Sequence, residues 1–203
     1  SISLHTGYAH NLTYGSYVNF DIDAYIPINQ NFEIESNARL STANMYTMGG
    51  KDKTKCAKCA RKSCLFPNRC PNLNHSHENI LELYKRIGKI KGVKRSFVGS
   101  GIRYDLFLDK DGFLDDTSYP YFKEVVTRHT SGWFKVAPEH TEDKVLKLMA
   151  KPPFALFSVL RREFDNLMRK EKLNYKIVPY FISSHPGCEL NDMIALSQNK
   201  DLK

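Results

Sequence analysis

The chain has 203 residues, a length that suits one domain with a sizeable core. Hydrophobic residues make up 41% of it, which excludes a disordered or fibrous protein. The formal net charge is +8, but acidic residues interrupt the basic ones, so a solvated surface is favoured and nucleic acid is the weaker alternative. No apolar run approaches the roughly 20 residues that cross a bilayer, and no signal peptide is evident, so we expect a cytoplasmic protein without membrane contact.

The composition of the chain changes near residue 40. Residues 1–40 contain no lysine and few charged side chains, whereas residues 51–203 are rich in lysine and strongly periodic. Such a break indicates a boundary, an insertion or a sequence of different origin. The chain begins at Ser1 and not at a methionine, so we expect a fragment of a longer protein.

Four of the five cysteines lie close together with the spacing C-x2-C-x4-C-x5-C; they are Cys56, Cys59, Cys64 and Cys70. Thiolates bind zinc and iron well, and a short segment closes around one ion at little entropic cost. We therefore predict a metal site, with zinc or an iron–sulfur cluster, in the Cys-rich segment (residues 50–77). Free or disulfide-bonded surface thiols are the alternative, because only the first pair has the C-x2-C spacing. His75 or His77 could replace one cysteine, and Cys188, which is remote, is interpreted as an ordinary thiol.

Helical and extended patterns alternate after the cysteines. Helices are predicted over residues 78–90, 119–129, 142–150 and 154–172, with a last one beginning near Leu190. Strands with their exit loops are predicted over 93–105, 133–140 and 175–187. The long helix 154–172 has one apolar face, made by Phe157, Leu160, Phe164, Leu167 and Met168. This alternation predicts an α/β fold with a parallel sheet, either a barrel or a doubly wound layer.

Polar residues collect where the three predicted strands end. The clusters are Ser100, Arg103 and Asp105; Glu139 and His140; and Ser183, Ser184 and His185. Chemistry in parallel α/β folds belongs at the carboxyl ends of the strands. We therefore expect the three clusters to form one functional region, which we call the strand-end site.

Five stretches of the sequence resemble the YgiQ-type radical SAM proteins, a bacterial family. They are TANMY (42–46), SCLFPNRCPNL (63–73), GVKRSFVGSGIRYDL (92–106), SGWFKVAPEHTEDKVLKLM (131–149) and VPYFISSHPGCELNDM (178–193). The similarity extends over roughly residues 41–195. It implies a partial parallel (β/α) barrel of the radical SAM type, with the Cys-rich segment as a metal-binding insertion.

The resemblance also implies cofactors. In the intact family, a 4Fe–4S cluster is held by a C-x3-C-x2-C loop after the first strand and binds S-adenosylmethionine. An electron from a reductant protein cleaves this cofactor, and the resulting radical abstracts hydrogen from a substrate that the sequence does not identify. The cofactor-binding residues implied are Ser100, Arg103, Lys135, Glu139, Ser183, Ser184 and His185.

Three of these residues have simpler interpretations. Arg103 suits a carboxylate because its fork binds two oxygens, but it could instead pair internally with Asp105. Glu139 could hydrogen-bond ribose hydroxyls, or could be a carboxylate at the start of the following helix. A single histidine is as often structural as catalytic, which leaves His185 open.

The first part of the chain departs from the family pattern. Residues 1–5 resemble the family's first strand, but Tyr8, Leu12 and Gly15 then occupy the three cysteine positions. The Gly-Gly-Pro that precedes TANMY in the family is replaced at residues 39–41. We therefore divide the chain into residues 1–41, a first strand and an atypical segment in place of the cluster loop, and residues 42–203, the barrel-like part.

These departures determine the expected function. The chain is predicted to be a fragment or degenerate form of a radical SAM protein that does not assemble the radical-generating cluster and is inactive as written. The alternative is a non-catalytic binding domain stabilised by zinc or a cluster. The family has cysteines at the positions of Cys59, Cys64 and Cys70 and a leading one near Gly50, for which Cys56 could substitute. This second group would hold an auxiliary cluster or structural zinc.

Overall fold

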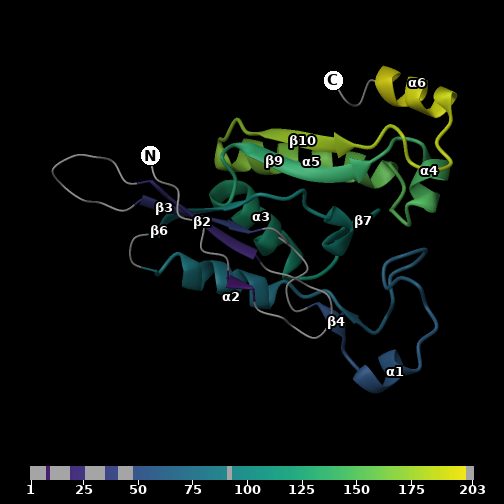
Figure 1. Cartoon of the computed structure of the whole chain (residues 1–203). Coiled ribbons are helices and arrows are strands. Elements are labelled where there is room, and N and C mark those ends of the chain that lie inside the picture. The colour runs from purple at the N-terminus through teal and green to yellow at the C-terminus, as the bar shows by residue number, and fades with distance from the viewer. Residues whose placement is uncertain (1–7, 10–18, 26–34, 41–47, 91–92, 200–203) are drawn as a thin grey trace.

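The computed structural model describes residues 8–9, 19–25, 35–40, 48–90 and 93–199 as a mixed α/β structure (Figure 1). Its strands are β1 (Tyr8–Ala9), β2 (Asn19–Tyr25), β3 (Glu35–Leu40), β4 (Gly49–Gly50), β5 (Leu73–Asn74), β6 (Val93–Val98), β7 (Leu108–Asp109), β8 (Gly112–Phe113), β9 (Trp133–Glu139) and β10 (Lys176–Phe181). Its helices are α1 (Lys53–Ala57), α2 (Glu78–Ile87), the 3-10 turn η1 (Tyr104–Leu106), α3 (Ser118–Arg128), α4 (Asp143–Leu148), α5 (Ala155–Glu171) and α6 (Leu190–Gln198). No helix in these ranges is long and apolar enough to cross a membrane.

Parallel strands carry the part of the fold on which the strand-end site is built. β9 pairs in parallel with β10, and β6 pairs in parallel with β3. A single parallel bridge from Ile102 to Val136 joins the chain after β6 to β9, so the two sheets adjoin. β1 and β2 extend the first sheet in antiparallel fashion, in the order β1-β2-β3-β6. The described sheets do not close into a barrel, and the radical SAM barrel stays a prediction.

The helices agree with the periodicity of the sequence. α2, α3, α4, α5 and α6 form where helices were predicted, and the expected apolar face of α5 is buried. The stretch 93–105, predicted as a strand with its exit loop, forms β6 as far as Val98 and then a loop that turns into η1. The first strand expected at residues 1–5 lies outside the described residues, as do Leu12 and Gly15 of the expected cluster loop.

The core lies between the β9–β10 pair and the helices α3 and α5. Phe134 of β9 is 1% exposed and stacks on Phe164 of α5, with ring centroids 5.8 Å apart. The same ring meets Phe122 of α3 edge to face at 5.8 Å. Because side chains alternate along a strand, the burial of Phe134 and Val136 turns Lys135 to the opposite face, together with Ala137 and Glu139.

The Cys-rich segment projects from the rest of the structure, and Figure 1 shows α1 at its far end. β4 and β5 pair in antiparallel fashion and hold the two ends of the segment together. α1 begins after Asp52, whose carboxylate accepts hydrogen bonds from the backbone N–H and the hydroxyl of Thr54. The segment is therefore an ordered insertion with local hydrogen bonds and few buried side chains.

His77, at the start of α2, is a core residue. Its side chain is fully buried and stacks on Tyr121 of α3 with ring centroids 4.2 Å apart. Neither ring nitrogen has a hydrogen-bond partner among the described residues. Burial lowers the pKa of His77 from 6.5 to about 4; the nearby His75 lowers it further and Asp115 opposes the change.

This lowered pKa predicts a loss of stability in acid. Between pH 6.5 and pH 4 the unfolded chain binds a proton at His77 that the folded chain does not, so the free energy of unfolding falls as the pH falls. The loss assigned to His77 is on the order of 3 kcal/mol. His77→Phe keeps the stacking and should flatten this part of the pH profile in urea unfolding experiments, whereas His185→Phe, on a more exposed loop, should not. An unchanged slope in His77→Phe would contradict the assignment.

Candidate strand-end site

The loop that follows β6 lies alongside β9, and the ends of β9 and β10 lie side by side. The backbone N–H of Ile102, after β6, donates to the carbonyl of Lys135 in β9 at 2.9 Å. The N–H of Ile182, after β10, donates to the carbonyl of Glu139 at the end of β9 at 2.7 Å. The arrowheads of β9 and β10 point toward α4 and α6 in Figure 1, so the exit loops of these strands share this edge with both helices.

Arg103 forms the internal pair that was its alternative interpretation. Its Nε lies 2.8 Å from Oδ1 of Asp105, and its terminal nitrogen lies 2.9 Å from Oδ2. The guanidinium fork is thus engaged by a carboxylate from its own loop, in the bidentate geometry that such pairs favour. A cofactor carboxylate would have to displace Asp105 to bind Arg103 in the same way.

Glu139 ends β9 and pairs across the edge with Lys151. The Lys151 Nζ donates to Glu139 Oε1 at 2.8 Å, and both side chains are largely buried. Glu139 has a φ of 71°, in the left-handed region that non-glycine residues seldom adopt. The alternative in which Glu139 serves the start of the next helix is not what the structure shows, since Glu142 holds the N-cap position of α4. A strained backbone that aims a carboxylate at a lysine is typical of functional sites.

The remaining predicted cofactor-binding residues form no charged pair of the kind made by Arg103 and Glu139. Ser100 has a buried Oγ with no hydrogen-bond partner among the described residues. Lys135 is half-buried on the same face of β9 as Glu139. Ser183 and Ser184 are exposed on the loop after β10, and Nδ1 of His185 lies 2.8 Å from the carbonyl of the next residue, Pro186. Lys135 and Glu139 thus share one face of β9, Ser100 lies two residues before the bridge from Ile102 to that strand, and the described contact of His185 is local.

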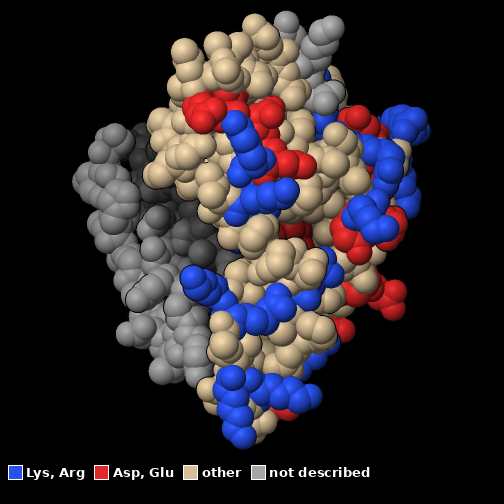
Figure 2. Space-filling model, turned by 90° about the vertical axis from the view of Figure 1, so that its right-hand side faces the viewer, with Lys and Arg blue, Asp and Glu red and all other residues tan. Residues whose placement is uncertain are grey.

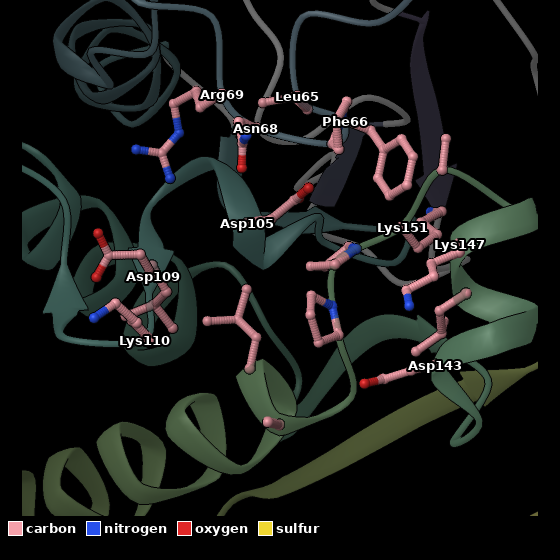
Figure 3. A pocket seen from close by; sticks show the side chains of 18 of the residues that line it. Leu65, Phe66, Asn68, Arg69, Asp105, Asp109, Lys110, Asp143, Lys147 and Lys151 are labelled. Carbon is pink, nitrogen blue, oxygen red and sulfur yellow. The ribbon is translucent and has the colours of Figure 1, made fainter.

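A cavity of about 820 Å³ lies beside these pairs (Figure 3). It separates the Cys-rich segment from the loops after β6 and from α4 and α5, and both Asp105 and Lys151 line it. Much of the lining is apolar, from Leu65, Phe66, Pro67, Leu108, Leu146, Ala150, Pro152, Pro153, Ala155, Leu156 and Val159. Figure 3 shows charged side chains on two sides of it, with Arg69 on one and Lys147 on the other. Size and lining suit a small molecule with an apolar body and a few polar groups.

The four clustered cysteines are reduced and have separate local contacts. The side-chain amide of Asn72 donates to Sγ of Cys56 at 3.2 Å, and the N–H of Arg61 donates to Sγ of Cys59 at 3.5 Å. The N–H of Cys70 donates to the carbonyl of Cys64 at 2.7 Å, which holds the last two cysteines together. Hydrogen bonds to sulfur also accompany metal-bound cysteines. Within the described ranges, however, no three His, Cys, Asp or Glu side chains are grouped as a metal site requires.

Cys56 lies where a side chain of residue 50 would lie. A Cβ atom added to Gly50 would be 2.1 Å from Sγ of Cys56, which is far inside any normal contact. The thiol of Cys56 therefore fills the space that a residue other than glycine would need at position 50. That Cys56 substitutes for a cysteine near Gly50 as a metal ligand stays a prediction.

Two contacts differ from the sequence interpretation or were missed by it. His77 cannot serve as a replacement metal ligand as placed, because its ring is buried in the core against Tyr121. Cys188, interpreted as an ordinary thiol, has its Sγ 3.5 Å from Nε2 of the buried His140. His140 follows β9 and Cys188 follows β10, and these two strands pair in parallel. Their common position after neighbouring strands is the signal from which the contact could have been predicted.

The face drawn in Figure 2 carries charges of both signs. Figure 2 shows acidic and basic side chains interspersed over the upper part of one face, with basic ones gathered at the lower end, where Figure 1 places α1. The basic residues of that end are Lys51, Lys53, Lys55, Lys58, Arg61 and Lys62. They flank the clustered cysteines, where positive charge also stabilises thiolates.

Comparison with known proteins relates the chain to one bacterial family. A relative from Bacteroides thetaiotaomicron is 49% identical over 158 residues, one from Porphyromonas gingivalis is 46% identical over 158 residues, and one from Fusobacterium nucleatum is 40% identical over 161 residues. Each carries the name UPF0313 protein, and each match covers 77% of this chain. The chain spans only about a quarter of the length of these relatives, at 26%, 25% and 27%. No protein-family model and no solved structure matches it.

The matched part of the chain is thus similar to the UPF0313 proteins, which are the YgiQ-type family indicated by the sequence motifs. The bacterial origin of the relatives agrees with that family. Their names state no activity, so the radical SAM chemistry, the cofactors and the metal remain predictions.

Gly187, on the loop after β10, offers a test of how this edge is built. Its φ is 86°, and an added Cβ would lie 2.5 Å from Cδ1 of Leu148. Leu148 is 60% exposed and can rotate away, so the backbone conformation should set the cost of Gly187→Ala. We expect the free energy of unfolding to fall by about 1–2 kcal/mol in urea titrations.

Two further variants separate the causes. Adding Leu148→Ala should not restore the stability, and full recovery would show that overlap with Leu148 sets the cost. Gly49→Ala is the matched control, because no atom lies within 4 Å of its added Cβ and its backbone is unstrained.

Proposed function

We propose that this chain is a degenerate piece of a radical SAM-type protein and acts as a metal-stabilised binding module. The Cys-rich segment is the part held by metal, and the strand-end site with its adjoining cavity is the part that binds ligand. The observation that carries this proposal is that the loop after β6 runs along β9 toward the adjoining ends of β9 and β10, and that Asp105 and Lys151, the partners of Arg103 and Glu139, line one cavity. Nucleic-acid binding is the less supported alternative.

The radical-generating cluster does not fit the residues of this chain. The positions where the family has cluster cysteines hold Tyr8, Leu12 and Gly15, and none of these side chains offers a thiolate. A 4Fe–4S cluster needs cysteine ligands of this kind. No radical step is therefore assigned to the chain, and hydrogen abstraction, with its reductant protein and substrate, belongs to intact members of the family.

The cofactor itself, S-adenosylmethionine, suits several groups at the strand ends. Its amino-acid part carries a carboxylate and an ammonium, and the sulfonium adds positive charge. Arg103 would take the carboxylate by exchanging it for Asp105, and Ser100, whose buried Oγ lacks a partner among the described residues, would add a donor. Glu139 would accept hydrogen bonds from ribose hydroxyls, and Lys135 lies on the same face of β9. Ser183, Ser184 and His185 would border the adenine or a substrate from the loop after β10.

The metal of the Cys-rich segment would be zinc or an auxiliary iron–sulfur cluster. Cys56, Cys59, Cys64 and Cys70 supply four thiols, and donors already reach two of the sulfurs. Closure around one metal requires these loops to draw together, which the few buried contacts of the segment permit. Bound metal would fix the wall of the cavity formed by Leu65–Arg69, so metal binding in the Cys-rich segment would also order the ligand site.

Metal binding and the role of Cys56 can be tested together. We expect anaerobic reconstitution followed by metal and sulfide analysis to give one zinc or one cluster per chain. Cys56→Ala should lower metal retention, and Gly50→Cys combined with Cys56→Ala should restore it, because removing the sulfur of residue 56 frees the space that a side chain at position 50 needs. Cys188→Ser is the control and should keep the metal. Unchanged metal retention in Cys56→Ala would show that Cys56 is not a ligand. Absence of metal from every form of the chain would refute the proposed metal site in the Cys-rich segment.

Cofactor binding is tested by equilibrium dialysis with labelled S-adenosylmethionine. Arg103→Met and Glu139→Gln should each weaken binding about tenfold or more, because each removes a charged hydrogen-bonding group. Ser184→Ala, at an exposed position, should weaken cofactor binding less than either of these variants. A strong reductant should yield no 5′-deoxyadenosine from the unsubstituted chain. Its formation would show that the chain is catalytic, and binding that neither Arg103→Met nor Glu139→Gln alters would place the cofactor elsewhere.

A further inference from the structure

The structure has a second cavity, at the end of the parallel strands opposite to the strand-end site. Its volume is about 640 Å³, and it lies where α2 and α3 end and where β6 and β10 begin. Figure 1 shows β9 and β10 starting at that end and pointing away from it. The proposed function makes no use of this space. We call it the basic cavity, and the residues that define it are Lys85, Lys89, Arg95, Glu124, Arg128 and Tyr175.

The charges on the wall of the basic cavity are unbalanced. Lys85 and Lys89, at the carboxyl end of α2, and Arg95 of β6 are exposed, and none of the three forms an ion pair with a described residue. Glu124 is the one acidic residue that lines the cavity within the described part of the chain. Its carboxylate lies 3.6 Å from Nε of Arg128, so its charge is already compensated. Three positive charges therefore have no carboxylate partner among the described residues.

The helix ends account for only part of this positive charge. Lys85 lies in the last turn of α2 and Arg128 in the last turn of α3, where cations complement the partial negative charge of a helix carboxyl end. Lys89 lies beyond the C-cap residue Gly88, and Arg95 lies on a strand. These two cations serve no helix end, and an anion in the cavity would give them a partner. The helix ends themselves repel anions, so binding would depend on the side chains.

The polar groups at the base of the cavity are held in place by hydrogen bonds within the protein. His129 is 6% exposed, with its Nδ1 2.8 Å from the carbonyl oxygen of Ser96 and its Nε2 3.5 Å from Oε1 of Glu124. The hydroxyls of Thr127 and Thr130 donate to backbone carbonyls of α3 at 2.8 and 2.9 Å. Because these hydroxyl hydrogens are already used, the donors left for a ligand are those of the cationic side chains. A ligand with several strongly accepting oxygens matches such donors best.

We propose that the basic cavity binds a small organic molecule that carries a phosphate group. At neutral pH a phosphate monoester has a charge of about −1.5 to −2 and three strong acceptor oxygens. The fork of Arg95 suits two of these oxygens, and Lys85 and Lys89 add point charges from α2. The organic part would lie against Val93 and the half-buried Tyr175, which line the same cavity. The volume of the cavity is in the usual range for sites of small molecules.

The test is isothermal titration calorimetry of the full chain in a buffer without phosphate. The probes are uridine monophosphate and glucose 6-phosphate, their unphosphorylated forms uridine and glucose, and inorganic phosphate. We expect at least one of the two esters to bind about tenfold or more tightly than both its unphosphorylated form and inorganic phosphate, because only the ester uses the cations and the apolar wall together. Added salt should weaken this binding, since the cations are exposed and therefore screened.

Substitutions then locate the phosphate. Arg95→Gln and Lys89→Gln should each weaken binding of the ester about tenfold, because each removes a charged donor. Both side chains are exposed, so the variants should fold. Lys147→Gln, on the wall of the first cavity, is the matched control and should bind the ester as the unsubstituted chain does. Excess S-adenosylmethionine should not displace the ester, since its proposed site lies at the other end of the strands, and failure of either proposal leaves the other standing.

Four results would overturn the proposal. The first is that neither ester binds, and the second is that inorganic phosphate binds as tightly as the esters, which would make the cavity a simple anion site. The third is weaker ester binding in Lys147→Gln but not in Arg95→Gln, which would place the phosphate in the first cavity. The fourth is tighter binding of a short single-stranded RNA than of either ester, lost in Arg95→Gln, which would make this face a surface for nucleic acid.

Discussion

The packing of Phe134 between α3 and α5 is the contact on which the rest of the structure depends. It commits one face of β9 to the core and, by strand alternation, turns Lys135, Ala137 and Glu139 to the other. Parallel pairing then places the end of β10 beside the end of β9. One buried ring thus determines both where the core lies and which polar groups can meet at the strand ends.

Much of this arrangement was predictable from the sequence, and the reason is periodicity. A helix of the length and apolar spacing of α5 has one stable solution, with the Phe157–Met168 face buried. What periodicity does not encode is which side chains pair across loops. The Glu139–Lys151 and His140–Cys188 contacts join irregular positions, and the left-handed backbone of Glu139 follows from its tertiary setting.

The strand-end site is built from charges that are already satisfied internally. Arg103 is held by Asp105 and Glu139 by Lys151, so neither polar pair is buried without compensation. A ligand entering this region would gain only the difference between its own contacts and those it replaces. Such a site favours ligands that carry both signs of charge, because these can exchange partners with both pairs at once. This suits the proposed cofactor better than a simple anion.

The proximity of Gly50 and Cys56 has a consequence for how relatives of this chain are recognised. A chemical group can move six places along a chain and stay at the same point in space, provided that a glycine is left where it used to be attached. An alignment scored column by column registers this as one residue lost and another gained. A comparison of side-chain positions registers no change. A search for functional cysteines that relies on aligned columns alone would therefore miss relatives in which the thiol is attached at a different position.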